Sequence, residues 1–240
     1  MKLSFADERV LAVMAHPDDA ELLCAGALAR AKADGAAIAI CVMCRGDKGV
    51  GAAKSASTAE NLGQLRHDEA AAAANVIGAT LFWFGAGDGE LFDTYENRRN
   101  LTEIYRKFRP TLVIAHAPED YHPDHRAAAA IAEAGTWFAA SRGHATVSPP
   151  LDSPPRLWFA DTLNMQEFAP DFFLNVGDQL EIKRRMLACH RSQLERGGDG
   201  DFVPLQDLLL RQAGARGAQA GCAAAEAFRW HQAFKRVGAF

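Results

Sequence analysis

Two short clusters of histidine and carboxylate residues contain the donor types that bind a divalent metal ion. The clusters are His16-Pro17-Asp18-Asp19 and His122-Pro123-Asp124-His125. Zinc takes histidine nitrogens and carboxylate oxygens, and a catalytic zinc site uses three protein ligands together with a water molecule. The two clusters, taken together, therefore predict a catalytic metal site.

The spacing inside each cluster also favours a shared ligand. His16 and Asp19 are three residues apart, and so are His122 and His125. One helical turn brings residues with this spacing to the same side, and a cation would relieve the repulsion between the adjacent carboxylates Asp18 and Asp19. The alternative for a single cluster is structural, because a histidine can hydrogen-bond locally and an aspartate can cap a helix.

The elements around the clusters indicate an α/β protein. Apolar runs typical of buried parallel strands lie at Val10–Ala15, Ala37–Met43, Thr80–Phe84, Thr111–His116 and Leu157–Asp161. Helical patterns lie at Asp19–Ala33, Leu62–Ile77, Tyr95–Phe108, Pro123–Ala140, Leu180–Leu194 and Leu205–Gln212. This alternation predicts a Rossmann-like three-layer sandwich, with helices on both faces of a mostly parallel central sheet. We expect one domain over residues 1–240.

Both clusters directly follow an apolar run. Ligands of open parallel sheets bind beyond the carboxyl ends of the strands, so we expect the clusters to meet at that edge. His116, at the end of the fourth predicted strand, is a candidate to support a metal ligand. The polar, glycine-rich stretch Arg45–Ser57 predicts a loop, which either covers the site or only connects two elements.

Composition limits the partners and the compartment. The net charge of −4 argues against nucleic acid, and the basic run Lys183-Arg184-Arg185 is typical of the solvated face of a helix. Met1–Val10 contains no apolar segment of a signal peptide, and no apolar run is long enough to span a membrane. The five cysteines are an odd number without framework spacing, so we expect reduced thiols in a cytoplasmic protein. Redox or metal use of Cys41-x-x-Cys44 is the less favoured alternative.

The sequence also resembles a known family. His16–Glu21 is similar to the A-H-P-D-D signature of the LmbE-like, or PIG-L, zinc N-deacetylases, and His122–Arg126 is similar to their second signature. Leu65–Ala70 resembles the family's arginine-bearing helix, and Lys183 with His190–Gln193 resembles its late K…H-x-S-Q stretch. The likeness extends over most of the chain.

The resemblance implies a role for each matching residue of the metal site. His16, Asp19 and His125 would be the metal ligands. Asp18 would be the general base that takes a proton from the attacking water, which the metal acidifies. The metal would be zinc, although histidine and carboxylate ligands also suit Fe²⁺ and other divalent ions.

Four further residues receive roles from the same resemblance. His122, held by Asp124, would stabilise the oxyanion or act as an acid. Arg66 and Asp88 would contact the substrate. Some relatives carry a tyrosine at the position of Asp120, so a role for Tyr121 stays open.

The activity implied by the resemblance is removal of an acetyl group from an N-acetylglucosamine-type amino sugar. Related enzymes often form rings of three or six, so we expect a homo-oligomer. Two alternatives stay open: a zinc amidase acting on a thiol-sugar conjugate or another amide, and a non-catalytic metal-binding Rossmann-like module. No G-x-G-x-x-G follows the first predicted strand, so dinucleotide binding is not expected.

Overall fold

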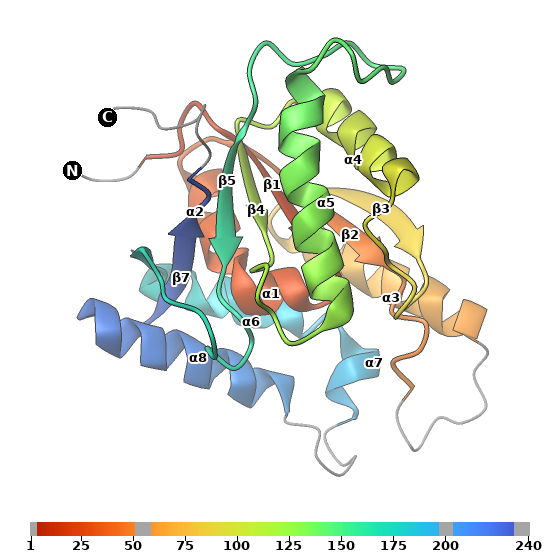
Figure 1. Ribbon diagram of the computed structural model, residues 1–240. Helices are drawn as coiled ribbons and strands as arrows, with labels where there is room; N and C mark the ends of the chain where they lie inside the picture. The colour runs from red at the N-terminus through yellow and green to blue at the C-terminus, as the bar shows by residue number, and fades with distance from the viewer. Residues whose placement is uncertain (1–3, 51–58, 197–203, 233–240) are drawn as a thin grey trace.

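A seven-stranded sheet forms the centre of the molecule in the computed structural model, which describes residues 4–50, 59–196 and 204–232 (Figure 1). The strand order is β3-β2-β1-β4-β5-β7-β6. The strands are β1 (Arg9–Met14), β2 (Ala37–Cys44), β3 (Thr80–Ala86), β4 (Leu112–Ala115), β5 (Arg156–Ala160), β6 (Phe172–Asn175) and β7 (Ala225–Trp230). Neighbours from β3 to β5 pair in parallel, whereas β7 is antiparallel to β5 and β6. The predicted α/β fold with a mostly parallel sheet is confirmed.

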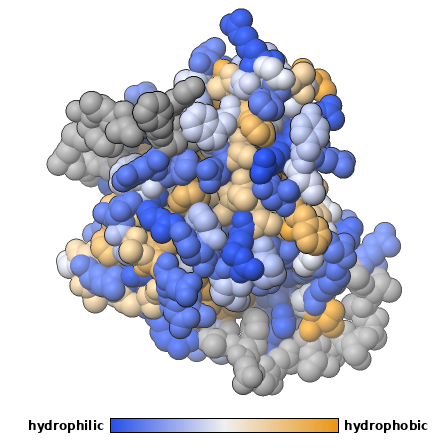
Figure 2. Space-filling model, viewed as in Figure 1, coloured by the Kyte–Doolittle hydropathy of each residue, from blue (hydrophilic) through white to orange (hydrophobic). Residues whose placement is uncertain are grey.

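Helices cover both faces of this sheet (Figure 1). They are α1 (Asp19–Leu23), α2 (Ala25–Ala33), α3 (Ala59–Val76), α4 (Tyr95–Phe108), α5 (Pro123–Ala140), α6 (Leu180–Leu187), α7 (Arg191–Leu194), α8 (Leu205–Ala220) and the 3₁₀ helix η2 (Gly177–Gln179). The helices α4 and α5 pack on one face, while α1, α2, α3, α6 and α8 pack on the other. Figure 2 shows weakly hydrophobic side chains along the solvent side of the alanine-rich α5.

Strand β1 explains why both faces need cover. Val10, Ala12 and Met14 are fully buried in the core under α1 and α2, while Leu11 and Val13 are buried in the core under α4 and α5. Successive side chains of a strand point to opposite faces, so an unbroken apolar run fits a strand buried on both sides. Each core therefore fixes the end of β1, from which the first cluster of polar residues begins.

The predicted helix Asp19–Ala33 is interrupted at Cys24, which separates α1 from α2. The carboxylate of Glu226 accepts the backbone N–H groups of Gly26 and Ala27 at 2.8 and 2.7 Å, which creates a new helix N-terminus. A carboxylate is favoured there because it satisfies free amides and opposes the helix dipole. The interruption depends on a residue 200 positions away, so the local pattern did not reveal it.

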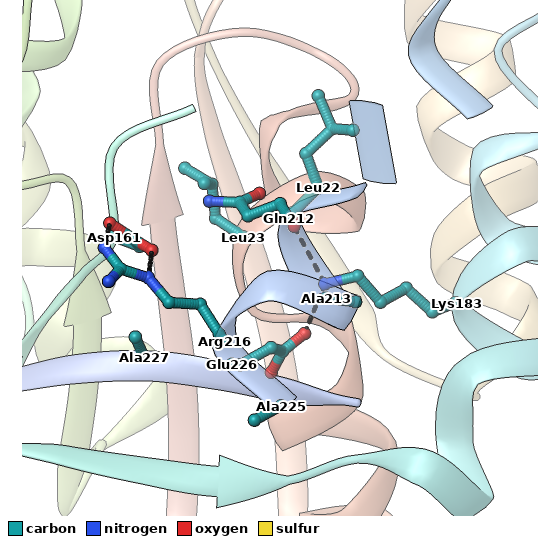
Figure 3. A pocket seen from close by; sticks show the side chains of 10 residues that line it. All are labelled: Leu22, Leu23, Asp161, Lys183, Gln212, Ala213, Arg216, Ala225, Glu226 and Ala227. Atoms are coloured by element: carbon teal, nitrogen blue, oxygen red, sulfur yellow. Dashed lines mark hydrogen bonds and ion pairs between the residues drawn. The ribbon is translucent and has the colours of Figure 1, made fainter. Parts of the chain in front are cut away.

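The basic run Lys183-Arg184-Arg185 was predicted to face solvent, and for Lys183 this is wrong. Its side chain is buried, with Nζ 2.5 Å from Oε1 of Glu226, whereas the other two residues are exposed. Figure 3 shows this pair beside a second buried pair, Arg216 and Asp161. The space between them is about 10 Å³, room for about one water molecule at most. The two ion pairs therefore have a structural role, and the space between them is not a ligand site.

Two other predictions at the C-terminal end need correction. The predicted helix Leu180–Leu194 consists of α6 and α7, separated at His190. The antiparallel strands β6 and β7 were not predicted, because β6 has only four residues and the apolar run of β7 is interrupted by Glu226 and Arg229. All five cysteines are free thiols. Within the described part of the chain, no helix combines the length and apolar character needed to cross a membrane.

Candidate metal centre

The centre lies where β1 and β4 end side by side. The two strands pair in parallel, with Val13 opposite Ala115, so their carboxyl ends open at the same edge of the sheet. The strand order also reverses between them, which is where ligands of such sheets bind. The segments His16–Asp19 and His116–His125 leave these two strand ends and converge, as the sequence predicted.

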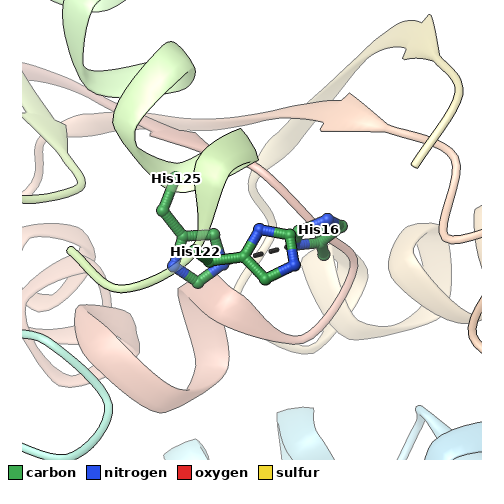
Figure 4. Close-up of side chains that lie close together, drawn as sticks. All are labelled: His16, His122 and His125. Carbon is green, nitrogen blue, oxygen red and sulfur yellow. Dashed lines mark hydrogen bonds between the residues drawn. The ribbon is translucent and has the colours of Figure 1, made fainter. Parts of the chain in front are cut away.

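Three donor atoms form a nearly equilateral triangle at this edge. His16 Nδ1 lies 3.2 Å from His125 Nε2 and 3.5 Å from Asp19 Oδ2, and the latter two atoms are 3.4 Å apart. Figure 4 shows His16, His122 and His125 clustered together, with a dashed line for the contact between His16 and His125. Two ligands of a tetrahedral zinc, with bonds of about 2.0–2.2 Å, lie about 3.3–3.6 Å apart. The triangle therefore fits a metal ion bound by the three residues that the sequence assigned.

The charges around the triangle also fit a cation. Burial alone would raise the pKa of Asp19, but the nearby His125 and His116 hold it well below its ordinary value. Burial would likewise lower the pKa of His16, yet hydrogen bonds to Asp124 and Asp19 raise it to about 10. A proton on a ligand nitrogen is what a metal ion must displace. These carboxylates thus create a strong preference for positive charge at the centre.

His116 supports the centre rather than ligating. Its Nε2 accepts the backbone N–H of Ala15 at 3.0 Å, so the lone pair on that atom is already used. Its ring stacks on the His125 ring with 3.9 Å between centroids. Burial, followed by the effect of His125, lowers the pKa of His116 to about 4. A neutral ring held in this way fixes the plane of the His125 ligand.

Other donors lie near enough to be compared with this triangle. His122 joins His16 and His125 in one group within 4.8 Å, and Cys44 with Asp88 joins His16 in another. Burial raises the pKa of the Cys44 thiol, which keeps it protonated, whereas metals bind the thiolate. The Nδ1 atom of His122 accepts a backbone N–H at 3.2 Å, so only its Nε2 remains available. We therefore take the triangle, rather than either of these two groups, as the metal site.

Each histidine of the triangle presents its other nitrogen to a carboxylate. His16 Nε2 lies 3.1 Å from Oδ2 of Asp124, which also accepts the Gly89 backbone N–H at 2.7 Å. His125 Nδ1 lies 3.0 Å from Oδ1 of Asp120, a carboxylate buried almost completely. Such carboxylates orient ligating imidazoles and increase their basicity. The sequence did not indicate this role for Asp120.

The expected contact between His122 and the Asp124 carboxylate is absent from this structure. His122 Nδ1 and Asp124 Oδ2 are 4.0 Å apart, beyond hydrogen-bond distance. His122 is instead the N-cap of α5, and its Nδ1 accepts the backbone N–H of Asp124. The helix start therefore orients His122, which leaves the carboxylate of Asp124 for His16.

Asp18 lies beside the triangle in a strained conformation that Arg66 holds. Its φ of 103° is in a region that side chains other than glycine rarely adopt. Arg66 Nη2 donates to Asp18 Oδ2 at 3.1 Å and to the Pro17 carbonyl at 2.6 Å, while Nη1 donates to the Gly46 carbonyl. Burial raises the pKa of Asp18 to about 6, against the opposing effect of Arg66.

Arg66 and Asp88 were predicted to contact substrate, and the structure gives both residues protein partners as well. Asp88 accepts the backbone N–H groups of Gly46 at 2.7 Å and Lys48 at 3.2 Å. These bonds fasten the start of the predicted loop Arg45–Ser57 beside the centre. Positions 51–57 of that loop lie outside the described residues. Direct contact of Arg66 or Asp88 with substrate remains a prediction.

A buried polar layer behind the centre was visible in the sequence only through the family resemblance. His190 is fully buried, with Nε2 3.4 Å from Oε2 of Glu21, on the helix that carries Asp19. Glu69 accepts the backbone N–H and the hydroxyl of Ser192 at 2.7 and 2.6 Å. These bonds attach α7 to α1 and α3, the two helices that support the first cluster and Arg66.

All the predicted site residues except Asp124 line one cavity of about 220 Å³. Tyr121, Leu163, Gln193 and Arg196 complete much of its wall. The cavity thus places the triangle, Asp18 and His122 within reach of one small molecule. This arrangement suits metal-assisted attack by water on a bound substrate.

Comparison with known proteins agrees with this geometry. Residues 11–135, more than half of the chain, match the family described as PIG-L: GlcNAc-PI de-N-acetylase. The chain belongs to the PIG-L family. Two kinds of activity occur among its named relatives, because some are deacetylases and one is a hydratase.

Three relatives illustrate this range. The chain is 28% identical over 188 residues to a 4-oxalmesaconate hydratase of Pseudomonas putida, covering 76% of this chain and 73% of the relative. It is 25% identical over 196 residues to a diacetylchitobiose deacetylase of Thermococcus kodakarensis, covering 78% and 70%. It is 29% identical over 177 residues to a 1D-myo-inositol 2-acetamido-2-deoxy-alpha-D-glucopyranoside deacetylase of Rhodococcus erythropolis, covering 63% and 60%.

Solved structures share the fold. The 4-carboxy-2-hydroxymuconate hydratase GalB of Pseudomonas putida superposes with a TM-score of 0.84 at 24% identity, covering 97% of this chain and 99% of that one. The N,N'-diacetylchitobiose deacetylase of Pyrococcus horikoshii superposes with a TM-score of 0.83 at 24% identity, covering 94% and 85%. In both comparisons, the shared sheet and helices extend over nearly the whole of this chain.

Proposed function

We propose that this chain is a metal-dependent hydrolase that removes an acetyl group from the nitrogen of an N-acetylglucosamine-type amino sugar. The observation that carries the proposal is the His16, Asp19 and His125 triangle with Asp18 beside it in one cavity. A zinc or other divalent ion held by the triangle would supply Lewis acidity toward water and the amide carbonyl. Deacetylases among the relatives support the choice of an N-acetyl amide.

Asp18 is the residue that accepts a proton from the attacking water. Its pKa of about 6 leaves the carboxylate mostly ionised at neutral pH, yet close enough to that pH to return the proton. Arg66 holds one carboxylate oxygen at 3.1 Å, so the position of the base is fixed before substrate binds. The backbone strain at Asp18 is consistent with a side chain held for chemistry rather than for stability.

His122 is the residue that donates a hydrogen bond to the substrate. Because Nδ1 accepts a backbone N–H, the proton of a neutral ring resides on Nε2. Burial, together with the nearby His125 and His16, lowers the pKa of His122, so the ring is neutral at pH 7. Of the two roles expected for His122, this favours oxyanion stabilisation: Nε2 donates a hydrogen bond to the carbonyl oxygen, and the departing amine takes the proton that Asp18 received from the water.

A second candidate is addition of water to the double bond of an unsaturated carboxylic acid. The 4-oxalmesaconate hydratase, matched over 76% of this chain, favours it. Such polyanionic substrates require several cationic contacts. The cavity wall includes the carboxylates Asp18 and Asp88. Of its two arginines, Arg66 is already bonded to Asp18 and to two backbone carbonyls, and Arg196 donates to the Gln193 side chain. A neutral amide therefore suits the described wall better.

The test is a substrate panel supplied to the zinc-loaded and the Fe²⁺-loaded protein. We expect acetate release from N-acetylglucosamine compounds, and none from Asp18→Asn. Release of an amine with a different acyl group, such as a thiol-sugar conjugate, would identify another amidase. Loss of the ultraviolet absorbance of a conjugated oxo-dicarboxylate, with no acetate from any sugar, would favour the hydratase and refute the proposal.

A further inference from the structure

The loop that follows β2 begins with a tight turn beside the metal-site cavity, residues 46–49, which we call the strap. The backbone N–H of Gly49 donates to the carbonyl of Gly46 at 3.4 Å and closes the turn. Asp88 accepts the backbone N–H groups of Gly46 and Lys48, and Lys48 Nζ donates to the Asp88 carbonyl at 2.6 Å. One side of the strap is therefore attached to the segment that follows β3.

Gln193 attaches the other side of the strap. This side chain is 3% exposed and lines the metal-site cavity, and the family resemblance gave it no role. Its Nε2 donates to the Gly49 carbonyl at 3.2 Å, while its Oε1 accepts Nη1 of Arg196 at 3.1 Å. A buried amide with both ends hydrogen-bonded has one defined orientation. Gln193 therefore holds the Gly49 carbonyl in a fixed position.

Arg66 lies under the strap and contacts both of its ends. Its Nη1 donates to the Gly46 carbonyl at 3.2 Å, the same oxygen that closes the turn. A Cβ atom at Gly46 would overlap with Arg66 Nη1, and one at Gly49 would lie 3.0 Å from the same nitrogen. Gly46 also has a φ of 70°, in the left-handed region that favours glycine. The backbone of the strap thus packs directly on the guanidinium.

The strap, α7 and α3 form a closed chain of contacts around Arg66. Helix α7, which carries Gln193, lies beside α3 and is attached to it by the bonds from Ser192 to Glu69 (Figure 1). Glu69 is three residues after Arg66, about one helical turn along α3. The strap is therefore held from the same helix that carries Arg66. A change at Gln193 reaches the guanidinium through the strap.

We propose that Gln193 is a positioning residue for the general base. It holds the strap, the strap holds Nη1 of Arg66, and Arg66 Nη2 holds Asp18 Oδ2 at 3.1 Å. When the Gly49 carbonyl is released, the turn loosens and the guanidinium loses its firm contact with one of its three acceptors. Asp18 then spends less time in the orientation that accepts a proton from water. This inference rests on the proposed function and deepens it.

Contact with substrate is the alternative role for Gln193, because the residue lies in the cavity wall. Kinetic constants separate the two roles. A side chain that only binds substrate raises KM when it is lost, whereas a side chain that positions the base lowers kcat and leaves KM unchanged.

The test is Gln193→Glu, which keeps the size of the side chain and the acceptor for Arg196 but has no N–H for the Gly49 carbonyl. We expect kcat for acetate release to fall about tenfold, as for one lost neutral hydrogen bond, while KM stays within about twofold and the metal content is unchanged. The matched control is Gln219→Glu, at an exposed amide whose Oε1 also accepts an arginine N–H, from Arg216, and it should leave kcat unchanged. An unaltered kcat for Gln193→Glu, or a loss confined to KM, would overturn the proposal.

A double-mutant cycle tests whether Gln193 acts through Arg66. If it does, adding Gln193→Glu to Arg66→Lys should change kcat by less than about twofold, because the forked side chain that the strap holds is already absent. A further loss of about tenfold in the double variant would mean that Gln193 acts by another route, and it would refute the proposed chain of contacts.

Hydrogen exchange separates failure of this inference from failure of the proposed function. The backbone N–H groups of Gly46 and Gly49 are hydrogen-bonded, to Asp88 and to the Gly46 carbonyl. Measured by NMR on the metal-loaded protein without substrate, both should exchange about tenfold faster in Gln193→Glu than in wild type. If no sugar releases acetate but this exchange is faster, the attachment of the strap by Gln193 stands and the proposed reaction fails. Equal exchange in both proteins would refute the role of Gln193, whatever the enzyme catalyses.

Discussion

Asp120 lies beneath His125, with its Oδ1 atom 3.0 Å from Nδ1 of the imidazole that contributes Nε2 to the donor triangle. Asp124 stands in the same relation to His16, at 3.1 Å from Nε2. In each histidine, therefore, a carboxylate contacts the ring nitrogen that does not belong to the triangle and so orients the ring. The orientation of the centre is built into the N-terminal turn of α5 and the segment just before it.

Asp120→Asn should weaken metal binding about 10–100-fold, because the amide orients the His125 ring less firmly and lowers its basicity. The affinity is measured by competition with a chromogenic chelator. The control is Asp152→Asn, since this carboxylate is 97% exposed and its one ion pair within the described residues is with Arg109 at the surface. Affinities that match for the two variants would contradict the role given to Asp120.

Asp18→Asn should keep its metal and lose activity by about 10²–10⁴-fold, the usual contribution of a general base. Metal content and acetate release are measured on the same sample. His125→Ala is the complementary variant and should lose the metal itself. A fully active Asp18→Asn protein would exclude Asp18 as the base, and a fully metallated His125→Ala protein would remove His125 from the ligand set.

Loading the metal at pH 7 should release about one proton per site. The pKa of His16, raised to about 10 in the metal-free protein, means that the ring is protonated at pH 7 and must become neutral to ligate. Metal affinity should accordingly increase as the pH rises toward 10. Calorimetric titration in buffers of different ionisation enthalpy measures the proton count, and a count of zero at pH 7 would contradict this charge assignment.

Arg66→Lys should reduce turnover by up to about 100-fold while the metal stays bound. Lysine keeps the charge but not the forked geometry that joins Asp18 Oδ2 to the carbonyls of Pro17 and Gly46. Arg45→Lys, which alters a half-exposed pair with Asp47, provides the comparison. Equal kcat in both variants would mean that Arg66 does not position the base.

Lys183→Met should destabilise the fold by about 3–5 kcal/mol, because the Glu226 carboxylate would remain buried without its cation. The control is Arg184→Met, at the position next to Lys183. It removes an exposed ion pair with Glu181 and should lower the free energy of unfolding by less than about 1 kcal/mol. Urea unfolding gives both free energies. A similar small loss in the two variants would show that the buried pair does not stabilise the junction of α1 and α2.

The sequence was most informative where local pattern and structure coincide. The apolar runs that became β1 and β4 are buried on both faces, so their composition alone indicated parallel strands. The polar clusters after them could be placed together because parallel strands end at one edge. The choice of His16, Asp19 and His125 as ligands within those clusters came from the family resemblance.

The features that the sequence did not reveal depend on distant partners. The interruption at Cys24 requires Glu226, and the burial of Lys183 requires the same carboxylate. Asp120 was considered only as a replaced tyrosine, because its contact with His125 depends on how the chain turns before α5. The family resemblance paired Asp124 with His122, whereas in the structure His122 caps α5 and the Asp124 carboxylate contacts His16.

The most direct test of the metal-dependent hydrolase is acetate release titrated against added metal. Chelator-treated protein, given an N-acetylglucosamine disaccharide, should be inactive and should regain activity in proportion to zinc or Fe²⁺ up to about one equivalent per chain. Acetate release by the chelated protein, or activity that does not depend on metal in the stoichiometric range, would contradict the account at its centre.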